Sequence, residues 1–263
     1  MIKKIRLSVF VIVCLSIWAT CLLHFISMAN TKINGVLLNN DSLSDNSYTF
    51  YVNKNHNHYR LIPSKKKNAL EEEHVIYAIK NNETKFLTPK EMRLYEIVNY
   101  YYETYKDKPE LEKIYAAVTM VDYLCRYDKT IDDKDRDTAY SCFVKRKGVC
   151  SNYARGLQVL LSSVNIFCGY ISGPVTDGRG NHAWNIIKLE DQFFHTDVTW
   201  CDNTDYIDEY YRIRPKLTYF LMNDSEASMS RKWNCKMYPA SNGDSKKYIK
   251  AVEEIVWNTA TNK

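Results

Sequence analysis

The stretch from residue 149 to residue 198 constrains the fold of this chain more than any other segment. Its first part carries apolar side chains at helical spacing, and its second part contains three short runs typical of strands, at 166–172, 182–189 and 193–198. The apolar helical positions are Val149, Tyr153, Leu157, Leu160, Leu161 and Val164. Ala154 and Gly156 are small, which suits a helix pressed closely against a sheet. This order predicts a helix packed on an antiparallel sheet.

Helical patterns also precede this stretch. Thr88-Pro89 is a start signal for a helix near 89–102, and Pro109 starts a second helix near 109–125. The remaining expected elements are a short helix at 139–144, a last strand at 219–222 and a C-terminal helix at 247–257. Because helices precede a helix-and-sheet unit and no internal repeat is visible, the elements predict one α+β domain over residues 69–263.

Three side chains in the constraining stretch have the types that nucleophilic catalysis needs. Gly148 lets the chain turn sharply into the predicted helix, so Cys150 lies in its first turn, where unpaired N–H groups and the helix dipole stabilise a thiolate. The basic run at 145–147 adds positive potential, and the Cys150 backbone N–H is a candidate oxyanion donor. His182 and Asp197 follow on the two hairpin strands. Together they offer a nucleophile, a base and an orienting acid.

The hairpin provides a geometric condition for this trio. Residues alternate faces along a strand, and cross-strand partners share a face. With an even-length turn at Glu190-Asp191, His182 and Asp197 fall on the same face, within reach of an imidazole–carboxylate hydrogen bond. An odd-length turn would separate them.

Each member of the trio also has an ordinary structural interpretation. A single exported cysteine is usually half of a disulfide or buried, a single strand histidine is usually structural, and Asp197 could cap a turn. The order, the sequence context and the shared face favour the catalytic interpretation when the three are taken together.

The N-terminal 29 residues are typical of a targeting segment. Lys3, Lys4 and Arg6 precede an uncharged stretch from Leu7 to Met28, which is long enough to span a bilayer. We expect a single-pass signal anchor with an extracellular C-terminal domain, the alternative being cleavage near Ala29 and secretion. Residues 30–68, rich in Asn, Ser and Lys, are expected to be a stalk or linker with at most one short strand.

Charge and cysteine content exclude some functions. The formal charge is +5, but without the three basic residues of the targeting segment 33 basic residues face 31 acidic ones, which gives no electrostatic basis for nucleic-acid binding. There is no C-x-x-C pair, so a structural zinc site is not expected. Export permits disulfides, but the pairing of five cysteines stays open: Cys125, Cys142, Cys168, Cys201 and Cys235.

Three sequence blocks carry a resemblance to a known family. G-V-C-S-N-Y-A-R-G (148–156), N-H-A-W-N-I-I-K-L (181–189) and F-H-T-D-V-T-W (194–200) together resemble the bacterial transglutaminase-like domain of the papain-like superfamily. The resemblance runs from about Leu87 to Met229. It implies a papain-like core, no cofactor and no metal, with Cys150 as nucleophile, His182 as general base and acid, and Asp197 orienting the imidazole.

The resemblance also implies supporting roles. Tyr127 is a candidate second oxyanion donor, and Trp184 and Trp200 are candidates for cleft walls or supports of the triad, or core residues. The chain departs from the family pattern at the hairpin turn and after Trp200, where Cys201-Asp202-Asn203 stands in place of Asp-Asp-Pro. These departures leave the triad intact but weaken any transfer of substrate.

The resemblance leaves the reaction open. A thioester on the cysteine can pass to water, which gives a protease or deamidase, or to an amine, which gives a crosslinking enzyme. Because the calcium-binding and accessory domains of animal crosslinking enzymes are not present in this chain, hydrolysis is favoured. The expected partners are a peptide or protein substrate, including cell-wall peptides, and the membrane through the N-terminal segment. The non-enzymatic alternative is a cell-surface protein-binding module that retains the fold.

Overall fold

The computed structural model describes residues 48–52, 59–63, 71–202 and 215–261. The chain divides into two compact units, Asp45–Val252 and a second formed by Met1–Ser44 with Glu253–Lys263. Of the second unit only the end of the last helix is described. The predicted targeting segment therefore lies outside the described residues, as does most of the predicted stalk. No helix within the described ranges is long and apolar enough to cross a membrane.

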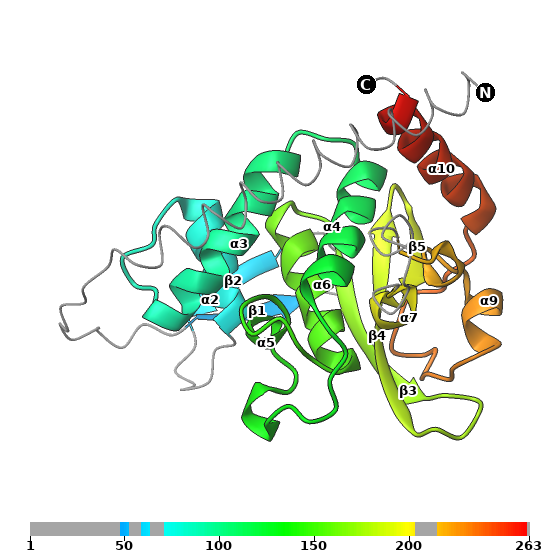
Figure 1. Ribbon diagram of the computed structural model, residues 1–263, viewed down its shortest axis with the longest axis horizontal. Coiled ribbons are helices and arrows are strands. Elements are labelled where there is room, and N and C mark those ends of the chain that lie inside the picture. Colours follow the sequence, from blue (N-terminus) through cyan, green and yellow to red (C-terminus); the bar gives the residue numbers. More distant parts are fainter. Residues whose placement is uncertain (1–47, 53–58, 64–70, 203–214, 262–263) are drawn as a thin grey trace, which may run out of the picture. The chain divides into compact units, whose positions relative to one another are not determined.

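The larger unit is α+β, as predicted. Figure 1 shows its helices and strands. The helices that precede the sheet are α2 (Glu71–Asn81), α3 (Pro89–Tyr105), α4 (Glu110–Leu124), α5 (Ala139–Phe143) and α6 (Cys150–Ser163), with a short 3-10 helix at Asp133–Asp135. The start of α3 follows from its sequence, because Thr88 and Glu91 form a capping box and Pro89 occupies the first turn.

The sheet has three antiparallel strands in the order β3-β4-β5, namely Cys168–Pro174, Asn181–Leu189 and Gln192–Thr196. Leu189 pairs with Gln192, so the hairpin turn contains only Glu190 and Asp191. The even turn that the sequence predicted is confirmed. Glu190 adopts a φ of 54°, which a tight two-residue hairpin turn requires.

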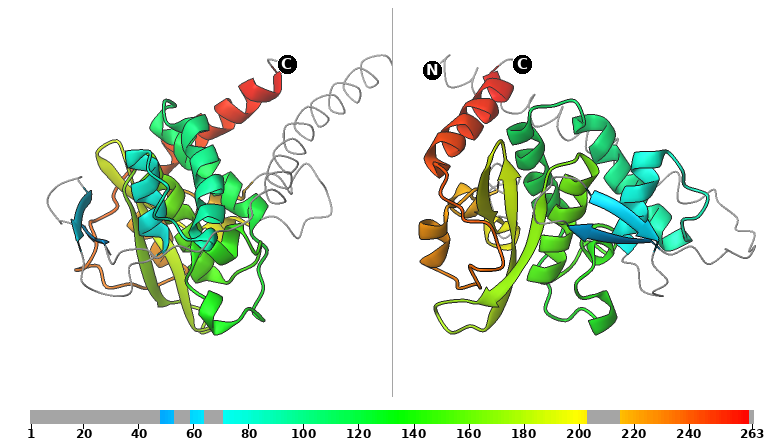
Figure 2. Two further views of the ribbon diagram at one scale, coloured as in Figure 1. Left: turned by 90° about the vertical axis from the view of Figure 1, so that its left-hand side faces the viewer. Right: turned by 180° about the vertical axis from the view of Figure 1, so that it is seen from behind.

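Helix α6 is central to this unit. It contacts β3 and β4 as well as α2, α3, α4 and α5, and Figures 1 and 2 show it between those helices and the sheet. Its predicted apolar face is buried from Val149 to Val164. The role of Gly156 is different from the prediction: a Cβ there would lie 2.9 Å from Cys142 Sγ and 3.4 Å from Val121 Cγ2. Gly156 therefore allows close approach of α5 rather than of the sheet, since a Cβ there would also lie 3.2 Å from Phe143 Cζ, while Val121 of α4 lies at ordinary contact distance.

The remaining elements follow the sheet or precede α2. After β5 come α7 (Val198–Cys201), a 3-10 helix (Leu217–Tyr219), α9 (Asp224–Ser228) and α10 (Ser245–Thr261). The predicted strand at 219–222 is wrong, because only Met222 pairs with a strand residue, in an isolated bridge to His195. Before α2, β1 (Tyr48–Val52) and β2 (Tyr59–Pro63) form an antiparallel pair where one short strand was expected.

Candidate active site

The first turn of α6 is tied to the preceding loop by Asn152. Its Oδ1 accepts a hydrogen bond from the Val149 N–H at 2.9 Å, and its Nδ2 donates to the carbonyl oxygens of Asp135 at 2.7 Å and Thr138 at 3.0 Å. Asn152 is fully buried. Because Cys150 is the first residue of this helix, these bonds fix where its thiol lies.

Gly148 is required for space at this helix start. A Cβ at position 148 would lie 2.5 Å from the Asn152 Cβ. The backbone of Gly148 pairs with the segment after α4: Gly148 N donates to Arg126 O and Asp128 N donates to Gly148 O, both at 2.9 Å. Gly148 does not have a positive φ, so the sharp turn that the sequence suggested is not what demands glycine here.

The environment of Cys150 favours its thiolate. Burial opposes the charged form, but hydrogen bonding to His182, the imidazolium charge and the backbone N–H groups of Ala183 and Ser151 outweigh it and lower the pKa of the thiol. The side chain remains partly accessible. A partly accessible thiol with a lowered pKa is the form in which cysteine acts as a nucleophile.

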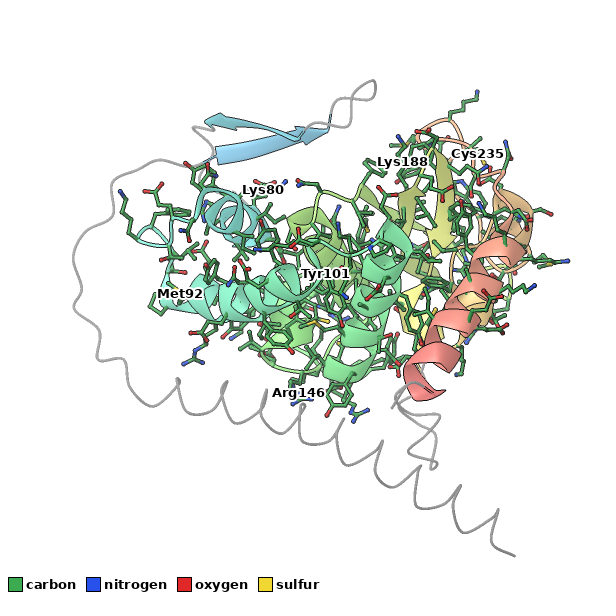
Figure 3. All side chains as sticks on the ribbon, turned by 90° about the horizontal axis from the view of Figure 1, so that it is seen from above. Lys80, Met92, Tyr101, Arg146, Lys188 and Cys235 are labelled. Carbon is green, nitrogen blue, oxygen red and sulfur yellow. The ribbon has the colours of Figure 1, made fainter. Side chains whose placement is uncertain are left out.

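The side chains of the basic run at 145–147 contact other groups. Lys145 pairs with Asp135 at 2.5 Å, and Lys147 lies 3.8 Å from Asp128. Arg146 lies over the Tyr123 ring and is labelled in Figure 3. The groups that lower the pKa of the Cys150 thiol are His182 and the backbone N–H groups of Ala183 and Ser151.

His182 and Asp197 meet as the hairpin geometry predicted. His182 Nε2 lies 2.7 Å from Asp197 Oδ2, and both side chains are buried, with exposed fractions of 8% and 0%. Asp197 itself is not on a strand, because β5 ends at Thr196. It is the N-cap of α7, where its Oδ1 accepts from the Trp200 N–H at 3.1 Å. The carboxylate therefore caps a helix with one oxygen and contacts His182 with the other.

The bond to Asp197 determines which His182 nitrogen faces the thiol. A carboxylate only accepts hydrogen bonds, so Nε2 carries a proton and Nδ1 is left for Cys150. Burial disfavours the imidazolium, but hydrogen bonds with Asp197 and Cys150 and their charges outweigh it and raise the pKa of His182 to about 9. Together with the lowered pKa of Cys150, this favours a thiolate–imidazolium pair near neutral pH.

The three supporting residues suggested by the sequence lie in different environments. Trp200 is partly buried and stacks on the His182 ring, with centroids 4.9 Å apart. Trp184 is fully buried, and its Nε1 donates to His195 Nδ1 at 3.0 Å, so it supports the site from inside and is no accessible cleft wall. Tyr127 is 47% exposed, and desolvation and the negative charge of Cys150 raise its pKa, which keeps its hydroxyl protonated as a donor.

Sequence reasoning missed Arg231. This side chain is fully buried and forms an ion pair with Asp197 through Nη1 and Oδ2. Arg231 stands between Ser230 and Lys232 in a polar run that gives no local sign of burial. Asn152 was also missed, although a polar residue among the apolar positions of a buried helix was a visible signal.

The described part of the chain contains two further kinds of chemically reactive group, namely potential metal ligands and thiols. Within residues 71–202 and 215–256, no three His, Cys, Asp or Glu side chains gather as metal ligands would. The described cysteines are all free thiols: Cys125, Cys142, Cys150, Cys168, Cys201 and Cys235. Of these, only Cys235 is exposed, and Figure 3 shows it at the surface.

A comparison with protein-family models agrees with the resemblance seen in the sequence. The family model of the transglutaminase-like superfamily matches residues 97–198, a range that contains Cys150, His182 and Asp197. A comparison with curated proteins finds no match.

Two solved structures show a distant likeness. One is a provisionally assigned cysteine protease from Cytophaga hutchinsonii, with 16% identity and a TM-score of 0.35 over 40% of this chain and 37% of that chain. The other is a TGase, with 14% identity and a TM-score of 0.35 over 52% of this chain and 38% of that chain. The chain thus matches under two fifths of the length of either structure. From the family match we conclude that this chain is a protein with a transglutaminase-like domain, placed by the family model at residues 97–198.

Proposed function

We propose that this protein is a cysteine acyl-transfer enzyme that acts on peptide or protein amides. One observation carries the proposal: Cys150 is the first residue of a buried helix, His182 lowers the pKa of its thiol, and His182 Nε2 is held by Asp197 Oδ2 at 2.7 Å. A nucleophile, a base and a third group that orients the base are the parts that such catalysis requires.

The chemistry follows from these contacts. The Cys150 thiolate attacks the amide carbonyl carbon and forms a C–S bond. The tetrahedral intermediate collapses with cleavage of the C–N bond, and the His182 imidazolium gives its proton to the leaving amine. Neutral His182 then takes a proton from the attacking water or amine, the C–S bond breaks and the thiolate is restored. Asp197 holds the imidazole in the required orientation throughout both steps.

We take the oxyanion donors to be the Cys150 backbone N–H and the Tyr127 hydroxyl. The N–H belongs to the first residue of α6 and has no partner within that helix. Tyr127 is placed by its backbone bridge to Gly148, two residues before the nucleophile. The charge of the Cys150 thiolate also acts on the Tyr127 hydroxyl and helps to raise its pKa.

We further propose that the domain works outside the cell and that water is the usual acceptor. The support for export is Lys3, Lys4 and Arg6 before the uncharged stretch that begins at Leu7. Digestion of intact cells with an added protease tests this location. The domain must be degraded without lysis, and protection until lysis would contradict it.

The nucleophile is tested by competitive alkylation with iodoacetamide, read peptide by peptide by mass spectrometry. Cys235 serves as the reference in the same tube, because it is the exposed described cysteine. Below the pKa of an ordinary thiol, about 8.5, Cys150 should react faster than Cys235, and His182→Gln should abolish that advantage. Equal rates in the wild-type protein would overturn the mechanism.

The acceptor is tested with glutamine-containing peptide libraries, with and without an added amine. Deamidation, amine addition and chain cleavage give different mass shifts, so one spectrum separates the three outcomes. Cys150→Ala is the control, and each activity must disappear in it. Faster alkylation of Cys150 without turnover of any library would favour the non-enzymatic binding module.

A further inference from the structure

Arg231 is a buried permanent charge next to the proposed triad. Its side chain has an exposed fraction of 0%. Nη1 donates to Asp197 Oδ2, and Nε donates to Ser230 Oγ at 3.2 Å. Nη2 has no hydrogen-bond partner within the described part of the chain. Because a buried guanidinium is rare and costly to desolvate, its position next to Asp197 requires an explanation.

Aromatic rings surround this guanidinium. Its central carbon lies 4.4 Å from the ring centroid of Trp200, 5.4 Å from that of Trp184 and 5.6 Å from that of Tyr219. Ring faces attract a cation, and the attraction is largest when water is excluded. They can also receive the N–H groups that find no oxygen acceptor. The rings therefore restrict the guanidinium to one place.

The backbone around Arg231 is fixed as well. Val175 and Arg231 form an antiparallel bridge, and Lys232 N donates to Pro174 O at 2.9 Å. Gly173 allows this docking, because a Cβ there would lie 1.9 Å from Lys232 O. Gly173 is also the residue that pairs with His182 across the sheet. The segment that carries Arg231 is thus attached to the same end of the sheet as the histidine.

One oxygen atom joins the two cationic side chains. Asp197 Oδ2 contacts both His182 Nε2 and Arg231 Nη1, while Oδ1 is occupied by the Trp200 N–H. The carboxylate is therefore held by three donors and cannot rotate away from His182. Its negative charge is shared between an imidazole, which must gain and lose a proton, and a guanidinium, which does not.

Three other titratable groups near this carboxylate carry no charge near neutral pH, whereas Asp122, a buried residue of α4, acts with Asp197 to raise the pKa of Cys201. Burial raises the pKa of Cys201 and Tyr127, and burial lowers the pKa of His195. Arg179 approaches the Trp200 ring but is exposed and paired with Asp177. Two cationic side chains therefore contact Asp197: His182, whose charge depends on pH, and Arg231, whose charge is permanent.

Resting on the proposed function, we propose that Arg231 is a positioning residue of the triad. It holds the Asp197 carboxylate toward His182 and offsets part of its negative charge, so that His182 can release its proton to a leaving amine as well as take one up. A buried carboxylate that faced His182 alone would bind the imidazolium more tightly, and a general acid that keeps its proton is a poor catalyst.

The test is the pH dependence of Cys150 alkylation by iodoacetamide in Arg231→Met, Arg231→Gln and Arg231→Lys. The alkaline limb of the profile reports loss of the imidazolium proton. Since two positive charges on one oxygen disfavour each other, a neutral residue at 231 should move this limb upward by at least about half a pH unit. Arg231→Lys, which keeps the charge, should leave it near the wild-type position, with slower peptide turnover because the fork geometry is lost.

A structural role alone would not move this limb. Glu91→Gln is the control, because it removes the buried carboxylate of a different ion pair, Glu91 with the partly exposed His74, and should lower stability without changing the profile. An unchanged limb in both neutral variants, or a downward shift, overturns the proposal. If only one of the two neutral variants folds, the alkaline limb of that variant is the test. If neither folds, a displaced alkaline limb in Arg231→Lys overturns the proposal.

The same experiment separates this inference from the proposed function. If wild-type Cys150 titrates like an ordinary thiol and His182→Gln changes nothing, the acyl-transfer proposal itself fails. If the wild-type profile depends on His182 but not on residue 231, only the role of Arg231 fails.

Discussion

Replacing Asn152 with alanine should loosen the helix start that carries Cys150. Asn152 makes three hydrogen bonds, one from the Val149 N–H and two to the carbonyl oxygens of Asp135 and Thr138. Alanine removes all three and leaves these backbone groups without partners in a buried place. At roughly 1 kcal/mol for each bond, the free energy of unfolding should fall by about 3 kcal/mol.

Thermal unfolding followed by circular dichroism measures this loss. For a domain of this size, about 3 kcal/mol corresponds to a fall in Tm of roughly 6–12 °C. Asn152→Asp should cost at least as much, because a carboxylate would face two carbonyl oxygens. Asn81→Ala, which removes one exposed bond to Tyr77 O, should stay within about 0.5 kcal/mol of the wild type.

The same variant should also change the chemistry at Cys150. The Ser151 N–H is one of the groups that lower the pKa of the thiol, and a frayed first turn would no longer hold it in place. Alkylation of Cys150 relative to Cys235 should therefore slow at neutral pH in Asn152→Ala. A fall in Tm below about 2 °C with an unchanged alkylation ratio would refute this account of the helix start.

Two further predictions concern packing and pH. Gly173→Ala should destabilise the protein by at least about 2 kcal/mol, measured from urea midpoints, because the new Cβ would lie 1.9 Å from the backbone oxygen of Lys232; a neutral result would show that this segment shifts freely. The raised pKa of His182, about 9, contributes stability that is present below the unfolded value of about 6.5 and is lost as pH rises through about 9, whereas the lowered pKa of Cys150 contributes stability that is lost as pH falls. Between about pH 6.5 and 8.5 the two effects oppose each other, so the unfolding free energy of the wild type should change little with pH, and a steady decline across this window would contradict the pairing.

Local sequence signals predicted those parts of the molecule that depend on local geometry. The capping box at Thr88 and Glu91 determines where α3 starts, and a two-residue turn determines which strand faces are shared. Parity therefore predicted that His182 and Asp197 share a face of the hairpin, although Asp197 lies one residue beyond the end of β5. The sequence did not predict that the strand ends before Asp197 and that α7 begins after it. Asp197 caps α7 through its Oδ1 atom, and this depends on the orientation of its side chain, which the apolar pattern does not specify.

Long-range pairing accounts for what the sequence did not predict. Arg231 reaches Asp197 across 34 positions, and nothing in the run Ser230-Arg231-Lys232 distinguishes the buried arginine from its neighbours. Likewise, the expected strand at 219–222 has suitable apolar residues but pairs only through Met222. Whether an apolar run forms a strand depends on a free sheet edge, which periodicity does not report.

The proposed site depends on how well α6 is fixed against the sheet, because its nucleophile and its base come from different layers. Asn185 provides a direct link: its Nδ2 donates to Ala154 O in α6 at 3.1 Å and to Gly169 O in β3 at 3.3 Å. Asn185 lies three residues after His182 on β4, and Ala154 lies four residues, about one helical turn, after Cys150. A shift of the helix along the sheet would break these buried bonds. The distance between thiol and imidazole is therefore set by the packing of the core as well as by the loops at the surface.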